Sequence, residues 1–190
     1  MGVLAMKATH SQTVQQKPVA LQVRPDGIGC SLKGRAQWVG WRYQWNGTKW
    51  TKPPFHVSGN FRASTTNPAT WSTFQDAYAA YLAGKIDGVG YVFGQGDGLV
   101  GIDLDHCIDL ISKKRAFTRA EAELIVLKFL DKAYIERSVG GDGAHLIVQG
   151  SALACGKGDG DLKFIEVYDS SSPRYFTVTG HRLPRGQEEP

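Results

Sequence analysis

Gly101-Ile102-Asp103-Leu104-Asp105-His106 places two carboxylates two positions apart, with apolar residues between them. In a β-strand, residues i and i+2 project from the same face. Asp103 and Asp105 should therefore point together, while Ile102 and Leu104 anchor the opposite face in a core. Two neighbouring carboxylates repel each other unless a cation lies between them, and Mg²⁺ takes oxygen ligands of this kind. A solvated edge strand would carry the same pattern, so the pair predicts a strand and leaves its chemistry open.

The segments around this stretch predict more strands. Residues 88–93 form an apolar run, and the glycine-rich turn 94–98 then leads into the Asp103 strand, which predicts a hairpin. Further strands are predicted on the C-terminal side, at residues 133–137, 144–148, 162–168 and 175–179.

Two helices are also predicted. Asn67 is a candidate N-cap, and Pro68 suits the first position of a helix. Aromatic residues then follow at helical spacing, and Gly84 is a plausible end. A second helix is predicted from the capping-box pattern 118–121 to about Lys132. Because the strands and helices do not alternate regularly, we predict an α+β fold with mixed or antiparallel sheets packed by helices.

Four tryptophans and one tyrosine crowd residues 38–50. Trp41, Tyr43 and Trp45 alternate as in a strand, and Asn46-Gly47 is a strong hairpin-turn signal. The rings could fill a core or could stack on nucleic-acid bases. The pattern predicts a β-hairpin and leaves its function open.

Composition limits the class of protein. The chain has 190 residues, of which 42% are hydrophobic, so we expect one domain with a real core. A net charge of +4 is compatible with polyanion binding but is common among other proteins. The three cysteines are far apart, which argues against a zinc knuckle or a disulfide framework.

No apolar run is long enough for a membrane span, and no signal peptide is recognisable. We therefore expect a cytoplasmic protein that does not contact a membrane. The polar, glutamine-rich residues 1–20 should form a flexible tail, and residues 21–185 should form the domain.

A glycine-rich segment, Ser138-Val139-Gly140-Gly141-Asp142-Gly143-Ala144-His145, lies between two predicted strands. Gly141 and Gly143 allow the backbone to approach a ligand closely, and exposed N–H groups in such a turn can bind an anion. Ser138 and His145 are suitable donors to phosphate oxygens. The Lys-Ser/Thr of a phosphate-binding P-loop is missing. A flexible hairpin with a surface histidine is the alternative.

Four more charged positions are candidates. Glu166 lies between Ile165 and Val167, so its carboxylate should leave the core and could join Asp103 and Asp105 in a metal site. Asp169, at the end of the same strand, competes for this role. Arg174 and Lys52 could bind phosphate, although ordinary surface positions would explain both.

Four motifs in order, GIDLDH, S-x-x-G-x-G-x-H, EVYD and RYFTVTG, resemble the primase-polymerase domains of phage and plasmid replication proteins, in the archaeo-eukaryotic primase superfamily. The resemblance spans residues 49–180 and implies a fold with an RRM-like catalytic core. Two departures are Gly140, where the family often has serine, and a longer segment at 170–173.

The resemblance also implies roles for individual residues. Asp103, Asp105 and Glu166 would hold two Mg²⁺ or Mn²⁺ ions, as in other two-metal sites. The nucleoside triphosphate would contact the loop of Ser138, Gly141, Gly143 and His145, together with Arg174 and Lys52. Tyr175 would lie near the nucleotide sugar.

The implied activity is template-directed nucleotidyl transfer, by a DNA polymerase, a primase or both. The substrates would be dNTP or NTP and a single-stranded DNA template with its primer. A helicase domain would follow in the same polypeptide, encoded by a phage or plasmid in a bacterial host. The alternatives are a metal-dependent nuclease or phosphodiesterase, and a non-catalytic module that binds single-stranded nucleic acid.

Overall fold

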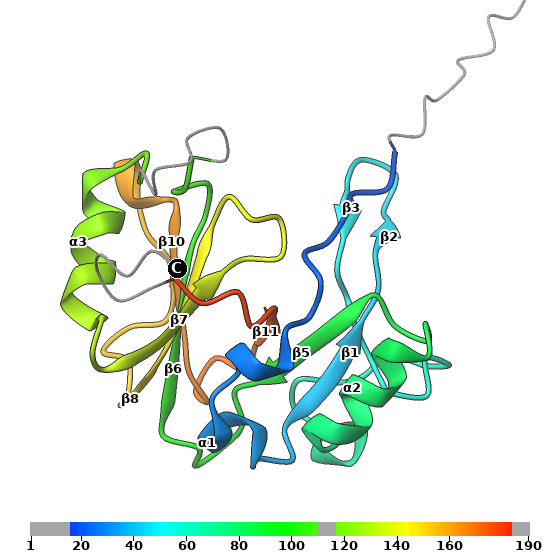
Figure 1. Ribbon diagram of the computed structural model, residues 1–190. Helices are drawn as coiled ribbons and strands as arrows, with labels where there is room; N and C mark the ends of the chain where they lie inside the picture. The colour runs from blue at the N-terminus through cyan, green and yellow to red at the C-terminus, as the bar shows by residue number, and fades with distance from the viewer. Residues whose placement is uncertain (1–15, 110–116, 184–190) are drawn as a thin grey trace, which may run out of the picture.

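The structure is a computed structural model that describes residues 16–109 and 117–183 (Figure 1). Antiparallel sheets and a few short helices make up this part of the chain, in agreement with the predicted α+β class. Residues 16–20 of the predicted tail have no regular secondary structure, and its first 15 residues lie outside the described residues. Among the described residues, no helix has the length and apolar composition needed to cross a membrane.

The second sheet in chain order carries the Asp103 stretch. Its strand order is β7-β8-β6-β10-β9, and every neighbouring pair is antiparallel. The strands are β6 (Leu99–Leu104), β7 (Ala133–Arg137), β8 (Ala144–Gln149), β9 (Gly156–Lys157) and β10 (Ile165–Tyr168). The strand predicted at 162–168 is shorter than expected, because its first residue belongs to the 3-10 helix η3 (Gly160–Leu162).

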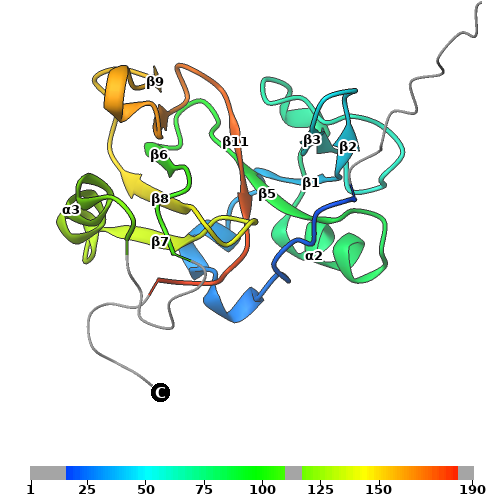
Figure 2. The same ribbon diagram turned by 90° about the horizontal axis from the view of Figure 1, so that it is seen from above.

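The first sheet joins strands from both ends of the chain in the order β11-β5-β1-β4. These strands are β1 (Trp38–Trp41), β4 (Pro54–Phe55), β5 (Gly88–Val92) and β11 (Tyr175–Val178). A separate two-stranded ribbon, β2 (Gln44–Trp45) with β3 (Trp50–Thr51), confirms the hairpin predicted around Asn46-Gly47. Seen from above, β11 lies between the second sheet and β5 (Figure 2).

The hairpin predicted between residues 88–93 and the Asp103 strand is wrong. β5 pairs with β1 and β11, whereas β6 pairs with β8 and β10, so the chain crosses from one sheet to the other between them. Asp97 fixes this crossing, because its carboxylate accepts hydrogen bonds from the backbone N–H groups of Gly94 and Leu99 and from the Gln37 side chain. The turn thus ends one sheet and starts the other.

Helix starts differ from prediction for local reasons. Asn67 caps only the 3-10 helix η2 (Pro68–Thr70), and α2 (Phe74–Leu82) begins later with Thr73 as its N-cap. The predicted capping box is also wrong, because the Thr118 hydroxyl donates to the carbonyl of His106 instead of capping α3 (Ala120–Phe129). Two short elements precede the first sheet, η1 (Pro25–Gly27) and α1 (Cys30–Lys33).

The two faces of the second sheet differ in character. One face is apolar, with Ile102 and Leu104 at 8% and 0% exposure, and it packs with residues of α3. This confirms the predicted role of both residues as core anchors. Only part of α3 faces this core, since Ala122 and Val126 are buried while Leu124 and Leu127 are 67% and 57% exposed.

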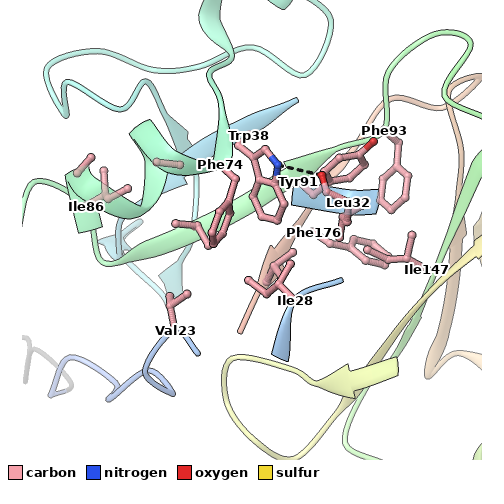
Figure 3. Close-up of a cluster of buried hydrophobic side chains, with 14 of the residues drawn as sticks. Val23, Ile28, Leu32, Trp38, Phe74, Ile86, Tyr91, Phe93, Ile147 and Phe176 are labelled. Carbon is pink, nitrogen blue, oxygen red and sulfur yellow. Dashed lines mark hydrogen bonds between the residues drawn. The ribbon is translucent and has the colours of Figure 1, made fainter. Parts of the chain in front are cut away.

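The other face meets the first sheet through aromatic side chains (Figure 3). The rings of Phe93 and Phe176 pack edge to face with centroids 5.0 Å apart, and Ile147 belongs to the same buried cluster. Gly101 permits this contact, since an added Cβ would lie 2.4 Å from Phe93 and 2.7 Å from Phe176. The glycine before the carboxylate pair therefore determines how closely the sheets approach.

We predict that Gly101→Ala destabilises the protein by about 1–3 kcal/mol, because the methyl group must displace two buried rings. Gly34→Ala is the matched control, because an added Cβ there meets its nearest backbone atom at an ordinary 3.4 Å. Urea unfolding measures both variants. Equal stability of the Gly101 variant and the wild type would show that the contact between the sheets does not limit packing.

Candidate functional site

A row of ionisable side chains crosses the second sheet. Strand register aligns Glu136, His145, Asp103, Glu166 and Lys157 on five neighbouring strands. Side chains at directly opposed positions of antiparallel strands share one face and lie close together. The row occupies the same face as Gly101, at the end of β6 away from the turn 94–98. The structure therefore brings the predicted Asp103, Glu166 and His145 together, and adds two residues that the sequence analysis missed.

Asp103 is the centre of the row. Its side chain is 26% exposed, and burial raises its pKa, with Asp105 and Glu166 acting in the same direction and His145 in the opposite one. Asp105 follows in a turn just past the strand, where its N–H donates to the carbonyl of Phe164 at 2.8 Å. It is 45% exposed. The carboxylate pair thus lies at the strand end, with one member half-buried and the other open.

Lys157 bridges the carboxylates from the edge strand β9. Its Nζ lies 2.7 Å from Glu166 Oε1 and 3.7 Å from Asp105 Oδ2. The hydrogen bond from Lys157 is the largest effect that lowers the pKa of Glu166, and the hydrogen bond from the Tyr168 hydroxyl lowers it further. Lys157 comes from a glycine-rich segment without strand periodicity, so no sequence signal identified it.

Glu136 is fully buried, and every side of its carboxylate has a donor. It accepts hydrogen bonds from the backbone N–H groups of Thr179 and Gly180, from the Thr179 hydroxyl and from the Tyr134 hydroxyl. Its Oε1 also lies 3.4 Å from Nδ1 of His145. The alternation in Ala133-Tyr-Ile-Glu-Arg137 was an available signal, because it puts Tyr134 and Glu136 on the polar face.

His145 lies between two carboxylates. Its Nε2 is 3.6 Å from Asp103 Oδ1, opposite the side that faces Glu136, and its ring stacks on Phe176 with centroids 4.9 Å apart. Burial would lower the pKa of His145, but Asp103 and Glu136 outweigh it, so the pKa is raised. An imidazole held between two carboxylates and facing the carboxylate row suits an anionic ligand that carries its own cations.

The glycine-rich loop closes on Ser138. The Ser138 N–H donates to the carbonyl of Gly143, the Gly143 N–H donates to Ser138 Oγ, and the Gly141 N–H donates to the Ser138 carbonyl. Gly141 has a φ of +86°, which favours glycine, and a Cβ at Gly143 would lie 2.8 Å from the carbonyl of Leu104. The loop therefore lies beside the end of β6, next to the carboxylate pair.

The remaining predicted contacts come from the first sheet and its connections. Burial lowers the pKa of Lys52. The negative charges of Asp103 and Asp105 act in the opposite direction, so Lys52 lies close to both carboxylates. Arg174 lies over the Tyr168 ring at 5.2 Å. The Tyr175 hydroxyl donates to the carbonyl of Lys52, so this hydroxyl already has a partner, and the predicted sugar contact stays a prediction.

Asp169 has a different environment from Glu166. One of its oxygens accepts from the backbone and hydroxyl of Ser171, and the other accepts from the N–H of Ala152. These hydrogen bonds lower its pKa well below the ordinary range. Asp169 thus joins two loops and has no contact with Asp103.

The donor set can be tested for a divalent cation. Asp103, Asp105 and Glu166 offer hard oxygen donors on one sheet end, and an ammonium group already lies among them. Within 16–109 and 117–183, however, no group of three or more His, Cys, Asp or Glu side chains converges as a metal site. The ion pair of Glu166 with Lys157 is one physical reason why the three carboxylates do not converge, because it directs the Glu166 carboxylate toward the edge strand β9.

No family model matches the sequence. The chain is 35% identical over 153 residues to a protein of Nitratiruptor phage NrS-1 named DNA primase-polymerase. The match covers 79% of this chain and 20% of the phage protein, so the chain spans about a fifth of the length of this relative.

We predict that Glu136→Ala lowers the free energy of unfolding by about 3–5 kcal/mol, because buried donors from Tyr134, Thr179 and Gly180 lose their acceptor. Glu123→Ala, on the exposed side of α3, is the control and should change it by less than about 0.5 kcal/mol. Chemical denaturation measures both. A Glu136→Ala variant as stable as the control would contradict a structural role for this carboxylate.

Asp169 generates a pH-dependent prediction. Since its pKa is lower in the folded state, its charge stabilises the fold above the unfolded pKa of about 3.9 and this contribution is lost as pH falls through the folded pKa. Asp169→Asn should therefore lower the melting temperature at pH 7, and the gap to the wild type should shrink below about pH 4. Asp161→Asn, at an exposed position, should show no such trend. A difference in melting temperature between Asp169→Asn and the wild type that stays constant from pH 7 to pH 3 would contradict this stabilising role of the Asp169 charge.

Proposed function

We propose that this chain is the catalytic domain of a DNA primase-polymerase, which adds nucleotides to a strand paired with a single-stranded DNA template. The observation that carries the proposal is the register that sets Asp103 between Glu166 and His145 on neighbouring strands. Three residues from separate sequence motifs, which the family resemblance assigns to one site, meet there. The similarity to the phage protein supports the same activity.

Asp103, Asp105 and Glu166 would hold Mg²⁺ or Mn²⁺, as two ions. The donor set fits because all three are hard oxygen ligands and because the Lys157 ammonium already occupies a cation position between two of them. When bound, such ions activate the attacking hydroxyl and neutralise the departing pyrophosphate. We take Glu166 as the third ligand, because the strand register sets it directly opposite Asp103, whereas Asp169 bonds to Ala152 and Ser171 in two loops.

The neighbouring cations and donors would bind the triphosphate. His145 is positioned by Glu136 at one ring nitrogen, so its other nitrogen faces the site next to Asp103. The loop of Ser138, Gly141 and Gly143 adjoins the same end of β6, and Lys52 approaches from the first sheet. Donors placed before substrate arrives stabilise developing charge without reorganising.

Arg174 would extend this phosphate-binding set along β10, since it lies over Tyr168, whose hydroxyl bonds to Glu166. Tyr175 would act through packing, by holding the Lys52 backbone. The primase-like RRM core, the helicase domain, the host cytoplasm and the domain limits 21–185 stay predictions.

Primer extension tests the proposal. Asp103→Asn should reduce nucleotide incorporation about 100-fold or more, because one ligand of a cation that stabilises the reacting charge is lost. It should also abolish the thermal stabilisation that Mn²⁺ gives the wild type. Asp161→Asn, away from the row, should behave as wild type in both assays.

Retained incorporation by Asp103→Asn would contradict the proposal. A parallel incubation with labelled DNA and no dNTP separates the nuclease alternative, because metal-dependent cleavage there would replace polymerase activity as the function. Wild-type protein that binds a single strand but shows neither reaction would favour the non-catalytic module.

A further inference from the structure

The net positive charge of this protein comes from one segment that has no acidic residues. Between Asp26 and Asp76 the sequence contains no aspartate or glutamate, although the whole chain has 18 acidic residues. The same segment carries the basic residues Lys33, Arg35, Arg42, Lys49, Lys52 and Arg62. It builds the strands β1 to β4, so these strands and the β2–β3 ribbon carry positive charge without acidic residues of their own.

Aromatic rings lead from the core of this segment to its surface. Buried Trp41 contacts Tyr43, Tyr43 contacts Trp50, and Trp50 contacts Trp45, with ring centroids 5.1, 6.3 and 5.8 Å apart. Trp45 and Trp50 are opposed residues of the β2–β3 ribbon and are only partly buried. The inner rings anchor the ribbon, and the outer two reach solvent.

A neighbouring turn adds to the same surface. Phe61 is 50% exposed, and its ring stacks on His56 with centroids 4.6 Å apart. Arg62 donates to the side chain of Gln44 on β2, which joins the turn to the ribbon. We call the set of Trp45, Lys49, Trp50, Phe61 and Arg62 the hairpin surface.

The hairpin surface begins at the candidate site. The β2–β3 ribbon and the C-terminal end of β6 point to the same side of the molecule, from opposite halves (Figure 1). Lys52 directly follows β3, and its charge interacts with Asp103 and Asp105. The Tyr175 hydroxyl fixes the backbone at Lys52. A strand that lies along the ribbon would thus reach the carboxylates at its base.

We infer that the hairpin surface binds single-stranded DNA and directs it to the acidic row. Sites for single strands combine positive charge that follows the backbone with aromatic rings on which bases stack. Core packing accounts for Trp41 and Tyr43, but it accounts neither for the exposed Phe61 nor for a segment without acidic residues. The inference rests on the proposed function for the choice of DNA as ligand.

Fluorescence anisotropy of labelled (dT)20, without metal or nucleotide, tests this inference. Trp45→Ala and Phe61→Ala should each weaken binding about tenfold or more, since stacking contributes about 1–3 kcal/mol per base. Lys49→Glu should weaken binding and make the negative slope of log K against log salt concentration less steep by about one. A duplex of equal length should bind more weakly, because its bases cannot stack on the rings.

Matched controls lie on α3, where Leu127 and Lys128 are also exposed. Leu127→Ala and Lys128→Glu should bind (dT)20 as wild type does. Thermal unfolding checks each variant, and Lys49→Glu keeps the test valid if Trp45→Ala unfolds the ribbon.

Wild-type affinity in both Lys49→Glu and Phe61→Ala would overturn the inference, and so would equal binding of the duplex. Failure of the proposed function would look different from failure of this inference. The wild-type protein would then bind (dT)20 at the hairpin surface but would not extend a primer.

Discussion

The buried carboxylate of Glu136 is the contact on which the rest of the site depends. An ionised group removed from water is costly unless donors surround it. Here the donors come from Tyr134 on the same strand and from Thr179 and Gly180 just after β11, so the carboxylate joins the second sheet to the end of the first. It also faces His145, which in turn faces Asp103. One group therefore fixes both the junction of the sheets and the orientation of the row.

The remaining architecture divides one sheet face into two zones. Near Gly101 the face is aromatic and closely packed, because only a glycine leaves space for Phe93 and Phe176. Two residues further along β6 the face becomes polar, and Asp103 is only partly exposed. The tight zone holds the first sheet and its basic segment beside the acidic row. Carboxylates suit the cations of the proposed nucleotide substrate, and the basic segment suits a DNA strand.

Sequence patterns predicted those features that depend on neighbours along the chain. The alternation around Asp103, the β8 and β11 segments and the Asn46-Gly47 turn are local, and the structure has each of them. Pairing partners are not local, so the predicted hairpin before Asp103 was wrong. Glu136 and Lys157 were missed for the same reason, since only strand register brings them into line with Asp103. The exposure of Leu124 and Leu127 likewise depends on how α3 packs, which helical spacing alone does not fix.

We propose that Asp103, Asp105 and Glu166 act together as ligands for the cations of a nucleoside triphosphate. A crystal structure with Mn²⁺ and a non-hydrolysable dNTP would test it most directly, because manganese is located by its anomalous scattering. We expect manganese peaks within about 2.0–2.3 Å of oxygens from these three carboxylates. We also expect Lys157 to be displaced from Glu166 and His145 to contact a phosphate. Manganese bound at Asp169, or a triphosphate bound away from His145, would contradict the account.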